Sequence, residues 1–288
     1  MKIVTSIVAV LAIWAQVPAP KVGPKAGTLL LSGAGELHGD PAVLERFAAL
    51  AGGADAEIVY IPTAASGIRL PSGFIAELPD SGEITPSVVA LESELAKLFR
   101  VRRVRVLHTR DAAVAKSEEF ARPLKTARAV WIGYGNAGRL ADLFLGTPVA
   151  RELNGILARG GVVAGNSAGA IIQGSFILRG RPDKPALIAR GHTTGFGFLR
   201  NIAINPHLTS ASREGELITV VDQHPELLGI GLEDTAALVI VGDTAEVVGS
   251  GRVAIYDDTR HEANWYYWLK SGDRFDLKLR RTIGGKNR

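Results

Sequence analysis

Ser167 lies in a short segment whose residue types suit a serine nucleophile. Residues 165–169 read Gly-Asn-Ser-Ala-Gly, follow the apolar run 162–164 and lead into a stretch of helical character over 168–173. Glycine on both sides of the serine permits a tight turn between strand and helix, which pushes the hydroxyl out of the sheet edge. We interpret Ser167 as the nucleophile of a serine hydrolase. The alternative is a strand–helix turn in which the serine only caps the helix.

A serine hydroxyl becomes a useful nucleophile only beside a general base that a third group orients. Histidine is the usual base, and four of the six histidines follow Ser167, at positions 192, 207, 224 and 261. In the chain order Ser, Asp or Glu, then His, the base is one of these four. Residue type alone leaves the choice among them open.

Alternating apolar runs and helical segments supply the elements that would position these groups. We expect strands over 28–32, 57–61, 104–107, 128–132 and 162–164, helices over 41–50, 86–99, 139–144 and 149–159, and a long loop over 63–85. Apolar strands separated by helices are typical of an α/β fold with a mostly parallel sheet and helices on both faces. Short runs over 229–232, 236–241, 245–248 and 253–256 predict a C-terminal antiparallel extension.

The first residues of the chain have the pattern of a secretory signal. Met1-Lys2 precedes an apolar run over 3–15, which is too short to cross a hydrocarbon layer of ~30 Å as a helix. We expect a signal peptide over 1–15, a linker rich in Pro and Lys over 16–26, and one domain over 27–288. This organisation predicts a secreted or periplasmic protein without stable membrane insertion after signal removal. An uncleaved N-terminal anchor is the alternative.

The composition excludes several function classes. Lys and Arg number 33 against 29 Asp and Glu, and the basic run 100–105 has no interleaved aromatic residues, so we expect no nucleic-acid partner. The chain has no cysteine, which excludes disulfides, thiolate metal sites and a cysteine nucleophile. A glycine-rich stretch over 133–135 could bind phosphate, but no P-loop lysine follows it. We expect neither a metal nor a cofactor.

Three segments resemble the cyanophycinase and peptidase E-like serine hydrolases. The family's nucleophile motif G-[TN]-S-A-G-A is matched by residues 165–170, and its W-x-G-G-G-D-Q-x-x-L element corresponds to 131–140. Its H-P-x-L-x-G-I-G-x-x-[DE]-D-T-A element is matched closely by 224–236. The resemblance extends over residues 28–279 and implies a class I glutamine amidotransferase-like fold, a flavodoxin-like three-layer arrangement.

The same resemblance implies roles for individual residues. Asp222-Gln223-His224 spells the family's base motif, yet His224 belongs to the later H-P-x-L element, and the family's spacing places the base at His207. The sequence Gly-Phe-Leu at 197–199 begins ten residues before His207, as in the family. The resemblance also implies an acid shortly after the nucleophile. Asp183 is the sole carboxylate between residues 167 and 207, which makes it our expected triad acid.

The resemblance further implies an oxyanion hole and substrate contacts. The two glycine-rich turns would supply the backbone N–H groups of Gly135 and Ala168. Three asparagines occupy motif positions that would contact substrate: Asn136, Asn166 and Asn205. The sequence departs from the family at three of these positions, because Ala137 stands where it has glutamine and Asn205-Pro206 stand where it has Asp-Gln before the base. In cyanophycinases these polar positions help to hold a β-linked aspartyl-arginine substrate.

These observations predict an extracytoplasmic serine peptidase or amidohydrolase of the cyanophycinase-like family. It would cleave a peptide or isopeptide bond, with an aspartyl linkage favoured, through an acyl-enzyme on Ser167. The partner would be a peptide or a small peptide-like substrate, and a homodimer is an open alternative to a monomer. Two other functions remain as alternatives: a serine esterase of the α/β-hydrolase kind, and a non-catalytic binding protein that kept the fold.

Overall fold

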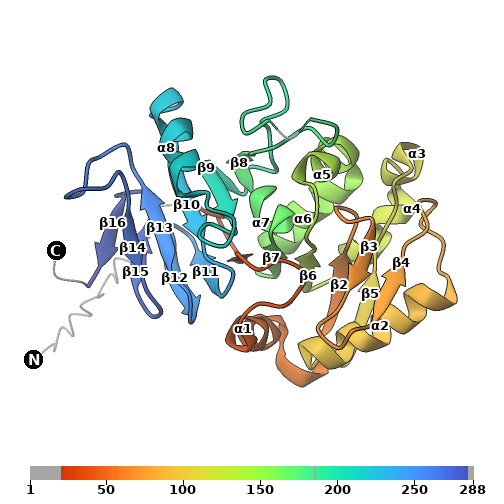
Figure 1. Ribbon diagram of the computed structural model, residues 1–288. Helices are drawn as coiled ribbons and strands as arrows, with labels where there is room; N and C mark the ends of the chain where they lie inside the picture. Colours follow the sequence, from red (N-terminus) through yellow and green to blue (C-terminus); the bar gives the residue numbers. More distant parts are fainter. Residues whose placement is uncertain (1–20, 185, 285–288) are drawn as a thin grey trace, which may run out of the picture.

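A nine-stranded sheet forms the centre of the molecule (Figure 1). The structure is a computed structural model that describes residues 21–184 and 186–284; the expected signal peptide and residues 16–20 of the expected linker lie outside the described residues. In spatial order the strands are β16 (Arg281–Ile283), β15 (Arg274–Asp276), β12 (Thr244–Gly249), β11 (Ala236–Val241), β1 (Thr28–Ser32), β7 (Val162–Asn166), β6 (Ala129–Ile132), β2 (Glu57–Ile61) and β5 (Arg103–Val106).

The sheet changes direction at β1. From β1 to β5 every neighbouring pair is parallel, whereas from β1 to β16 every pair is antiparallel. The parallel strands β1, β7, β6 and β2 are buried over most of their length because both of their faces are covered, whereas the edge strand β5 alternates buried and exposed residues. The helices are α1 (Pro41–Ala51), α2 (Pro86–Phe99), α3 (Ala112–Ala115), α4 (Glu118–Ala121), α5 (Ala137–Phe144), α6 (Pro148–Ala158), α7 (Ala168–Ile171) and α8 (Glu214–Gln223), with 3-10 turns at Gly53–Asp55 and Arg122–Lys125.

A second sheet of five strands lies beside the first. Its order is β14 (Tyr267–Leu269), β13 (Val253–Tyr256), β10 (Leu228–Leu232), β9 (Leu199–Pro206) and β8 (Gly174–Phe176). The strands β8, β9 and β10 are parallel, and β13 and β14 are antiparallel additions. Buried side chains of both sheets share one hydrophobic cluster, which includes Leu29 and Leu31 of β1 and Ile202 and Ile230 of the second sheet.

The opposite face of the first sheet packs on α1 and α2, which lie together below the sheet in Figure 1. Three fully buried rings form its centre, with Phe47 4.9 Å and Phe99 5.2 Å from the ring of Trp131. Local sequence starts both helices: Asp40 and Thr85 accept backbone N–H bonds as N-caps, each directly before a proline. Burial of the aromatic rings then fixes the helices on the sheet, because each ring removes a large apolar area from water.

The expected α/β fold, with a parallel central sheet, helices on both faces and C-terminal antiparallel strands, is confirmed. Two details differ. The expected loop 63–85 contains a hairpin formed by β3 (Gly67–Arg69) and β4 (Ile75–Glu77). The expected C-terminal extension is divided between the two sheets, since β11 and β12 continue the first sheet while β10 and β13 belong to the second. Period-2 patterning identifies strands but does not assign them to sheets.

Part of the expected linker is held against the domain. The backbone N–H groups of Lys21, Val22 and Gly23 donate to the carboxylate of Asp243, over 2.8–3.0 Å. The backbone N–H of Arg200, on β9, donates to the Val22 carbonyl at 2.9 Å. Residues 21–23 therefore connect the β11–β12 turn of the first sheet to the second sheet.

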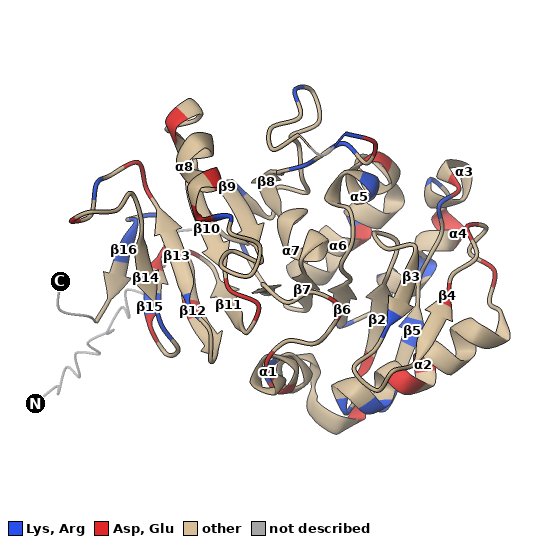
Figure 2. Cartoon of the chain, viewed as in Figure 1, with Lys and Arg blue, Asp and Glu red and all other residues tan. Residues whose placement is uncertain are grey.

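Charged residues are interspersed along the described chain (Figure 2). In the basic run 100–105, Arg100 pairs with Glu45 at 3.0 Å and Arg102 pairs with Glu57 at 2.8 Å. Carboxylates thus lie beside two of its four arginines. None of the helices in the described ranges has the length and the apolar character that a membrane crossing requires.

Candidate active site

Ser167 occupies the turn between β7 and α7 in a conformation that few non-glycine residues adopt. Its φ is 50° and its ψ is −113°, and its backbone N–H donates to the Ser32 carbonyl of the neighbouring strand at 3.2 Å. The flanking glycines permit this turn, because a Cβ at Gly165 would lie 2.3 Å from the Gly169 carbonyl oxygen and one at Gly169 would lie 2.0 Å from that of Ile132. The sequence-based expectation of a tight strand–helix elbow agrees with this geometry.

His207 lies directly after β9 and contacts the serine. The distance from His207 Nε2 to Ser167 Oγ is 2.9 Å, within hydrogen-bonding range. The histidine also has a positive φ, of 59°, which turns the chain at the strand end. The structure thus brings together the two residues expected to act as nucleophile and base, although 40 residues separate them in sequence.

Asp234 is the carboxylate that contacts this histidine. Its Oδ1 lies 2.5 Å from His207 Nδ1. Parallel pairing of β9 with β10 explains the contact, because Pro206 lies opposite Leu232 and both strands end at the same edge. With Nδ1 protonated toward Asp234, Nε2 is left to accept the hydrogen bond of the Ser167 hydroxyl.

The expected triad acid, Asp183, does not contact His207, so the structure contradicts this prediction. Its carboxylate is bound by Arg181, with contacts of 2.9 and 2.6 Å, in the exposed segment between β8 and β9. The Arg181 guanidinium lowers the pKa of Asp183 through that hydrogen bond. Asp183 lies between the expected nucleophile and the expected base in the sequence, whereas Asp234 follows the base. The signal that could have found it was an acidic residue two positions after a predicted apolar strand.

The alternative base is placed away from the serine. His224 ends α8, where its backbone N–H donates to Val220, and its ring packs against Phe176 with 4.8 Å between centroids. His261 contacts Asp257 through Nε2 at 2.8 Å. Tertiary contacts therefore select His207 from the histidines that the sequence left open.

The two expected oxyanion donors flank the serine. Ala168 is the first residue of α7, so its N–H is one of the groups that a helix leaves without an internal partner. Gly135 has a φ of 132°, in a turn between β6 and α5. Within the described residues, neither N–H donates to another protein group. Both are thus available to a developing negative charge on a substrate oxygen.

A cavity of about 360 Å³ opens at the serine. Its lining combines both glycine-rich turns with polar and apolar side chains: Gly35, Glu36, Tyr134, Gly135, Asn136, Ala137, Ser167, Ile171, Leu178, Arg179, Pro206, His207 and Arg213. This volume lies within the range of small-molecule and peptide side-chain sites. The cavity is therefore the candidate substrate site.

Two of the three asparagines expected to bind substrate do not line this cavity. Asn166 is fully buried and bridges Trp131 Nε1, at 2.8 Å, to the Gly35 carbonyl, at 2.6 Å. Asn205 is also fully buried and donates to Glu216 at 2.8 Å. Their amides are used inside the protein, where a buried polar group needs a partner. Asn136 does line the cavity, but its side-chain oxygen caps α5.

The cavity contains two guanidinium groups that the sequence analysis did not single out. Arg179 is bound to the Glu216 carboxylate and to Asn205. Arg213 donates to the Pro206 carbonyl at 3.1 Å, and no carboxylate within the described ranges forms an ion pair with it. Burial, and then the nearby Arg179, lower the pKa of Arg213. Glu216 and Asp234 oppose this shift, and an anionic group entering the cavity would stabilise the charged guanidinium further.

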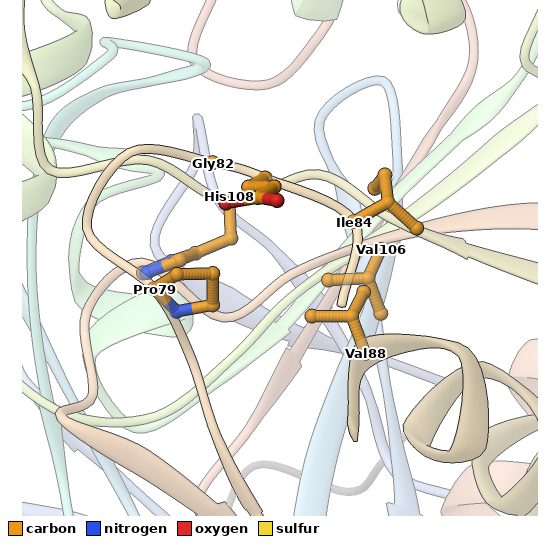
Figure 3. A pocket seen from close by; sticks show the side chains of 7 residues that line it. Pro79, Gly82, Ile84, Val88, Val106 and His108 are labelled. Carbon is orange, nitrogen blue, oxygen red and sulfur yellow. The ribbon is translucent and has the colours of Figure 1, made fainter. Parts of the chain in front are cut away.

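A second, much smaller cavity is lined by residues between 79 and 108 and includes neither Ser167 nor His207 (Figure 3). It has a volume of about 10 Å³, which suits one water molecule, and is lined by Pro79, Gly82, Glu83, Ile84, Val88, Val106 and His108. Burial is the main cause that lowers the pKa of His108 to about 4, and the ring contacts Thr63 through Nδ1. Its size excludes it as a peptide site.

Comparison with known proteins places the chain in a family. The model of Peptidase family S51 matches residues 29–248, which is most of the chain and includes the serine, the histidine and the aspartate described above. The chain belongs to peptidase family S51. It is therefore a serine peptidase-type hydrolase, and the alternative of a non-catalytic binding protein no longer applies.

Curated relatives and solved structures agree with the family. Cyanophycinase of Geminocystis herdmanii (strain PCC 6308) is 28% identical over 238 residues, which are 81% of each chain. Cyanophycinase of Trichormus variabilis (strain ATCC 29413 / PCC 7937) is 28% identical over 241 residues, 82% of this chain and 74% of the relative. A crystal structure of a peptidase from an acI-B1 Actinobacterium shares the fold, with a TM-score of 0.62 at 22% identity over 87% of this chain and 97% of its own. The expected resemblance to cyanophycinase and peptidase E-like hydrolases is confirmed.

Proposed function

We propose that this S51 peptidase cleaves a peptide or isopeptide bond beside an aspartyl residue, through an acyl-enzyme on Ser167. The observation that carries the proposal is the hydrogen-bonded chain from Ser167 Oγ through His207 to Asp234, which lies at a cavity large enough for a peptide side chain. Serine hydrolases of unrelated folds use this same constellation.

The proposed reaction follows from these contacts. Ser167 Oγ attacks the scissile carbonyl carbon while His207 Nε2 accepts the hydroxyl proton. The carbonyl oxygen becomes an oxyanion and accepts hydrogen bonds from the N–H groups of Gly135 and Ala168. When the C–N bond breaks, His207 returns the proton to the leaving amine, and an acyl ester remains on the serine. Water, deprotonated by His207, then attacks this ester, which releases the acid product and restores the hydroxyl.

Asp234 supports both proton transfers in this scheme. It accepts the hydrogen bond of Nδ1–H, keeps the ring in the productive tautomer and stabilises the imidazolium that forms during each step. Removal of one oxyanion donor from a serine protease costs on the order of 10²–10³ in turnover, so Gly135 and Ala168 would share the largest electrostatic contribution.

The preference for an aspartyl substrate rests on the charge of the cavity. Arg213 lines it without a carboxylate partner among the described side chains, and Arg179 lies nearby. A guanidinium bonded to a substrate carboxylate forms a strong, charge-assisted pair. The relatives named cyanophycinase agree with a substrate that contains aspartyl groups. With a neutral substrate, the half-buried Arg213 guanidinium would have only the Glu216 and Asp234 carboxylates, neither of them in an ion pair with it, to offset its charge.

A fluorophosphonate probe tests the nucleophile. We expect a covalent adduct on Ser167, located by mass spectrometry, that disappears in Ser167→Ala and His207→Ala but persists in His224→Ala. Folded protein that remains unlabelled would refute the proposal. Rates with matched aspartyl and asparaginyl peptides then test specificity, and matched esters distinguish a peptidase from an esterase.

We also propose that residues 1–15 direct export from the cytoplasm. The support is the charged start, the apolar run 3–15 and the small residue at position 15. N-terminal sequencing of the protein recovered from a culture medium or periplasm should begin at Gln16. Retention of full-length protein in the cytoplasm would refute this proposal.

A further inference from the structure

The turn that contains Gly135 rests directly on the peptide group between Ala64 and Ala65. A Cβ placed on Gly135 would lie 2.2 Å from the Ala64 carbonyl oxygen and 2.7 Å from the Ala65 nitrogen. Glycine is thus required by close approach as well as by its φ of 132°. Because the two backbone segments are in contact, the orientation of the Gly135 N–H depends on where residues 64 and 65 are held.

The guanidinium of Arg139 holds that segment. Its Nη1 donates to the Ala64 carbonyl at 2.8 Å, and the same oxygen accepts the backbone N–H of Asn136 at 3.0 Å. The Asn136 side chain in turn accepts the backbone N–H of Arg139 at 3.0 Å. The three bonds connect the first turn of α5, the glycine turn and the loop that follows β2.

A second arginine reinforces the first. Arg110 donates through Nη2 to the Ala65 carbonyl and pairs through Nη1 with Asp80 at 3.0 Å. Burial and the neighbouring Arg110 lower the pKa of Arg139, and Asp80 opposes them. Two like charges placed this close cost electrostatic energy that apolar side chains would avoid. The two guanidinium groups instead supply several N–H donors in a fixed geometry to the adjacent carbonyls of Ala64 and Ala65.

We propose that Arg139 is a positioning residue for the oxyanion hole, which fixes Ala64 and thereby aims the Gly135 N–H at the substrate oxygen. The inference rests on the proposed function of Ser167. Arg139 does not line the cavity at Ser167. It therefore acts through the backbone of Ala64 and does not touch substrate. Preorganised donors accelerate a reaction because they need no reorientation as charge develops.

The experiment compares Arg139→Gln and Arg139→Lys with the wild type, using the fluorophosphonate probe on the full chain. The probe's maximal labelling rate reports stabilisation of the charged transition state, and its half-saturating concentration reports ground-state binding. We expect Arg139→Gln to lower the maximal rate ~10- to 100-fold, a fraction of what loss of a whole donor causes, with the half-saturating concentration changed less than ~3-fold. Arg139→Lys retains a charged donor group at this position. It should recover most of the labelling rate that Arg139→Gln loses.

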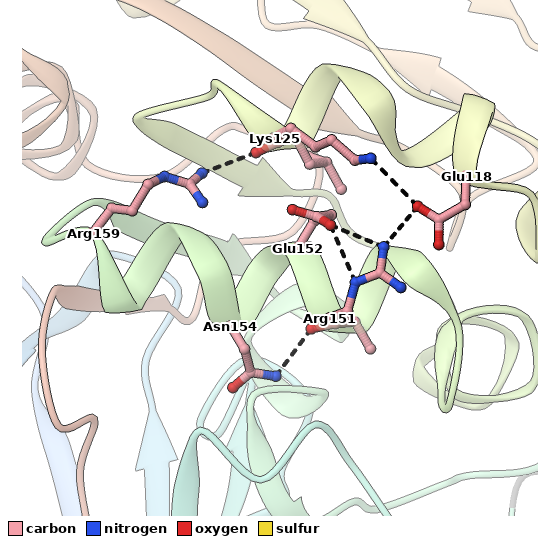
Figure 4. A network of polar contacts seen from close by, with 8 residues as sticks. Glu118, Lys125, Arg151, Glu152, Asn154 and Arg159 are labelled. Atoms are coloured by element: carbon pink, nitrogen blue, oxygen red, sulfur yellow. Dashed lines mark hydrogen bonds and ion pairs between the residues drawn. The ribbon is translucent and has the colours of Figure 1, made fainter.

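A surface arginine provides the matched control. Arg151 on α6 lies in an exposed network with Glu118 and Glu152 (Figure 4), at 2.7 and 3.0 Å. Arg151→Gln should change the labelling rate less than ~2-fold, since exposed ion pairs contribute little. A peptide aldehyde, whose adduct with Ser167 places an oxygen in the oxyanion hole, should lose affinity for Arg139→Gln in the same proportion as the labelling rate.

Each outcome has a distinct meaning. If the wild type is not labelled at Ser167, the proposed function fails. If the wild type is labelled and folded Arg139→Gln is labelled at the same maximal rate, the positioning role is refuted while the proposed function stands. A higher half-saturating concentration with an unchanged maximal rate would also refute it, because it would place Arg139 in ground-state binding.

Discussion

Replacement of Asp234 by asparagine tests which carboxylate supports His207. The structure places Asp234 against the histidine, whereas the sequence predicted Asp183. Asparagine keeps the size of the side chain and can still contact Nδ1 across the 2.5 Å gap. It removes the negative charge, and its amide favours the wrong histidine tautomer. The matched variant is Asp183→Asn, which breaks an exposed pair with Arg181 and leaves His207 untouched.

The expected magnitude follows from the exposure of the pair. In a well-buried triad, loss of the aspartate charge lowers turnover ~10⁴-fold. Here 36% of the Asp234 side chain and 21% of the His207 side chain are exposed, so water screens part of the interaction. We therefore expect a decrease of ~10²–10³-fold, equivalent to about 3–4 kcal/mol at ~1.36 kcal/mol per tenfold change. For Asp183→Asn we expect a change within ~2-fold, because exposed ion pairs are weak.

The assay is the rate of fluorophosphonate labelling, followed by hydrolysis of an aspartyl peptide, for both variants and the wild type. Circular dichroism and thermal unfolding confirm that each variant is folded. The assignment of Asp234 is refuted if Asp234→Asn retains wild-type rates. A large loss of labelling and hydrolysis rate in folded Asp183→Asn would also contradict the assignment of Asp234, because it would indicate that Asp183 supports His207.

Three further predictions concern other features of the molecule. Gly135→Ala should lower the labelling rate at least ~10²-fold, the cost of losing an oxyanion donor, because its Cβ would lie 2.2 Å from the Ala64 oxygen; wild-type labelling by a folded variant would contradict the assignment. Arg213→Gln should raise the KM for aspartyl peptides ~10-fold, as expected for a charge-assisted hydrogen bond, with matched asparaginyl peptides nearly unaffected; equal effects on both would contradict carboxylate recognition. Burial holds the pKa of His108 at about 4, below its usual 6.5, so the unfolded chain binds the extra proton first and stability is lost as the pH falls from 6.5 to about 4. Urea unfolding at pH 7 and pH 4.5 should show this loss, on the order of 2–3 kcal/mol, in the wild type and a smaller loss in His108→Leu; parallel curves would refute it.

Local sequence determined the strand–helix turn that carries Ser167 and most of the elements around it. The turn at Ser167 needs glycine on both sides because neighbouring backbone lies within 2.3 Å of where each Cβ would be, and that requirement is visible as Gly-x-Ser-x-Gly. Helices α1 and α2 begin at Pro41 and Pro86, where the sequence predicted them, and the structure shows a capping side chain directly before each proline. Such features depend on contacts within a few residues, so the chain order records them directly.

The carboxylate that contacts His207, the side chains that line the cavity and the division into two sheets were decided by tertiary structure. Asp234 reaches His207 because β9 and β10 pair in parallel and end at one edge, a register that no local pattern specifies. Asn166 and Asn205 occupy motif positions but are buried, and their amides satisfy internal partners instead of substrate. Asp183 has the expected spacing but lies on an exposed segment beside Arg181. Residue type and spacing identify what chemistry a side chain can do, whereas strand pairing and burial decide which side chains meet.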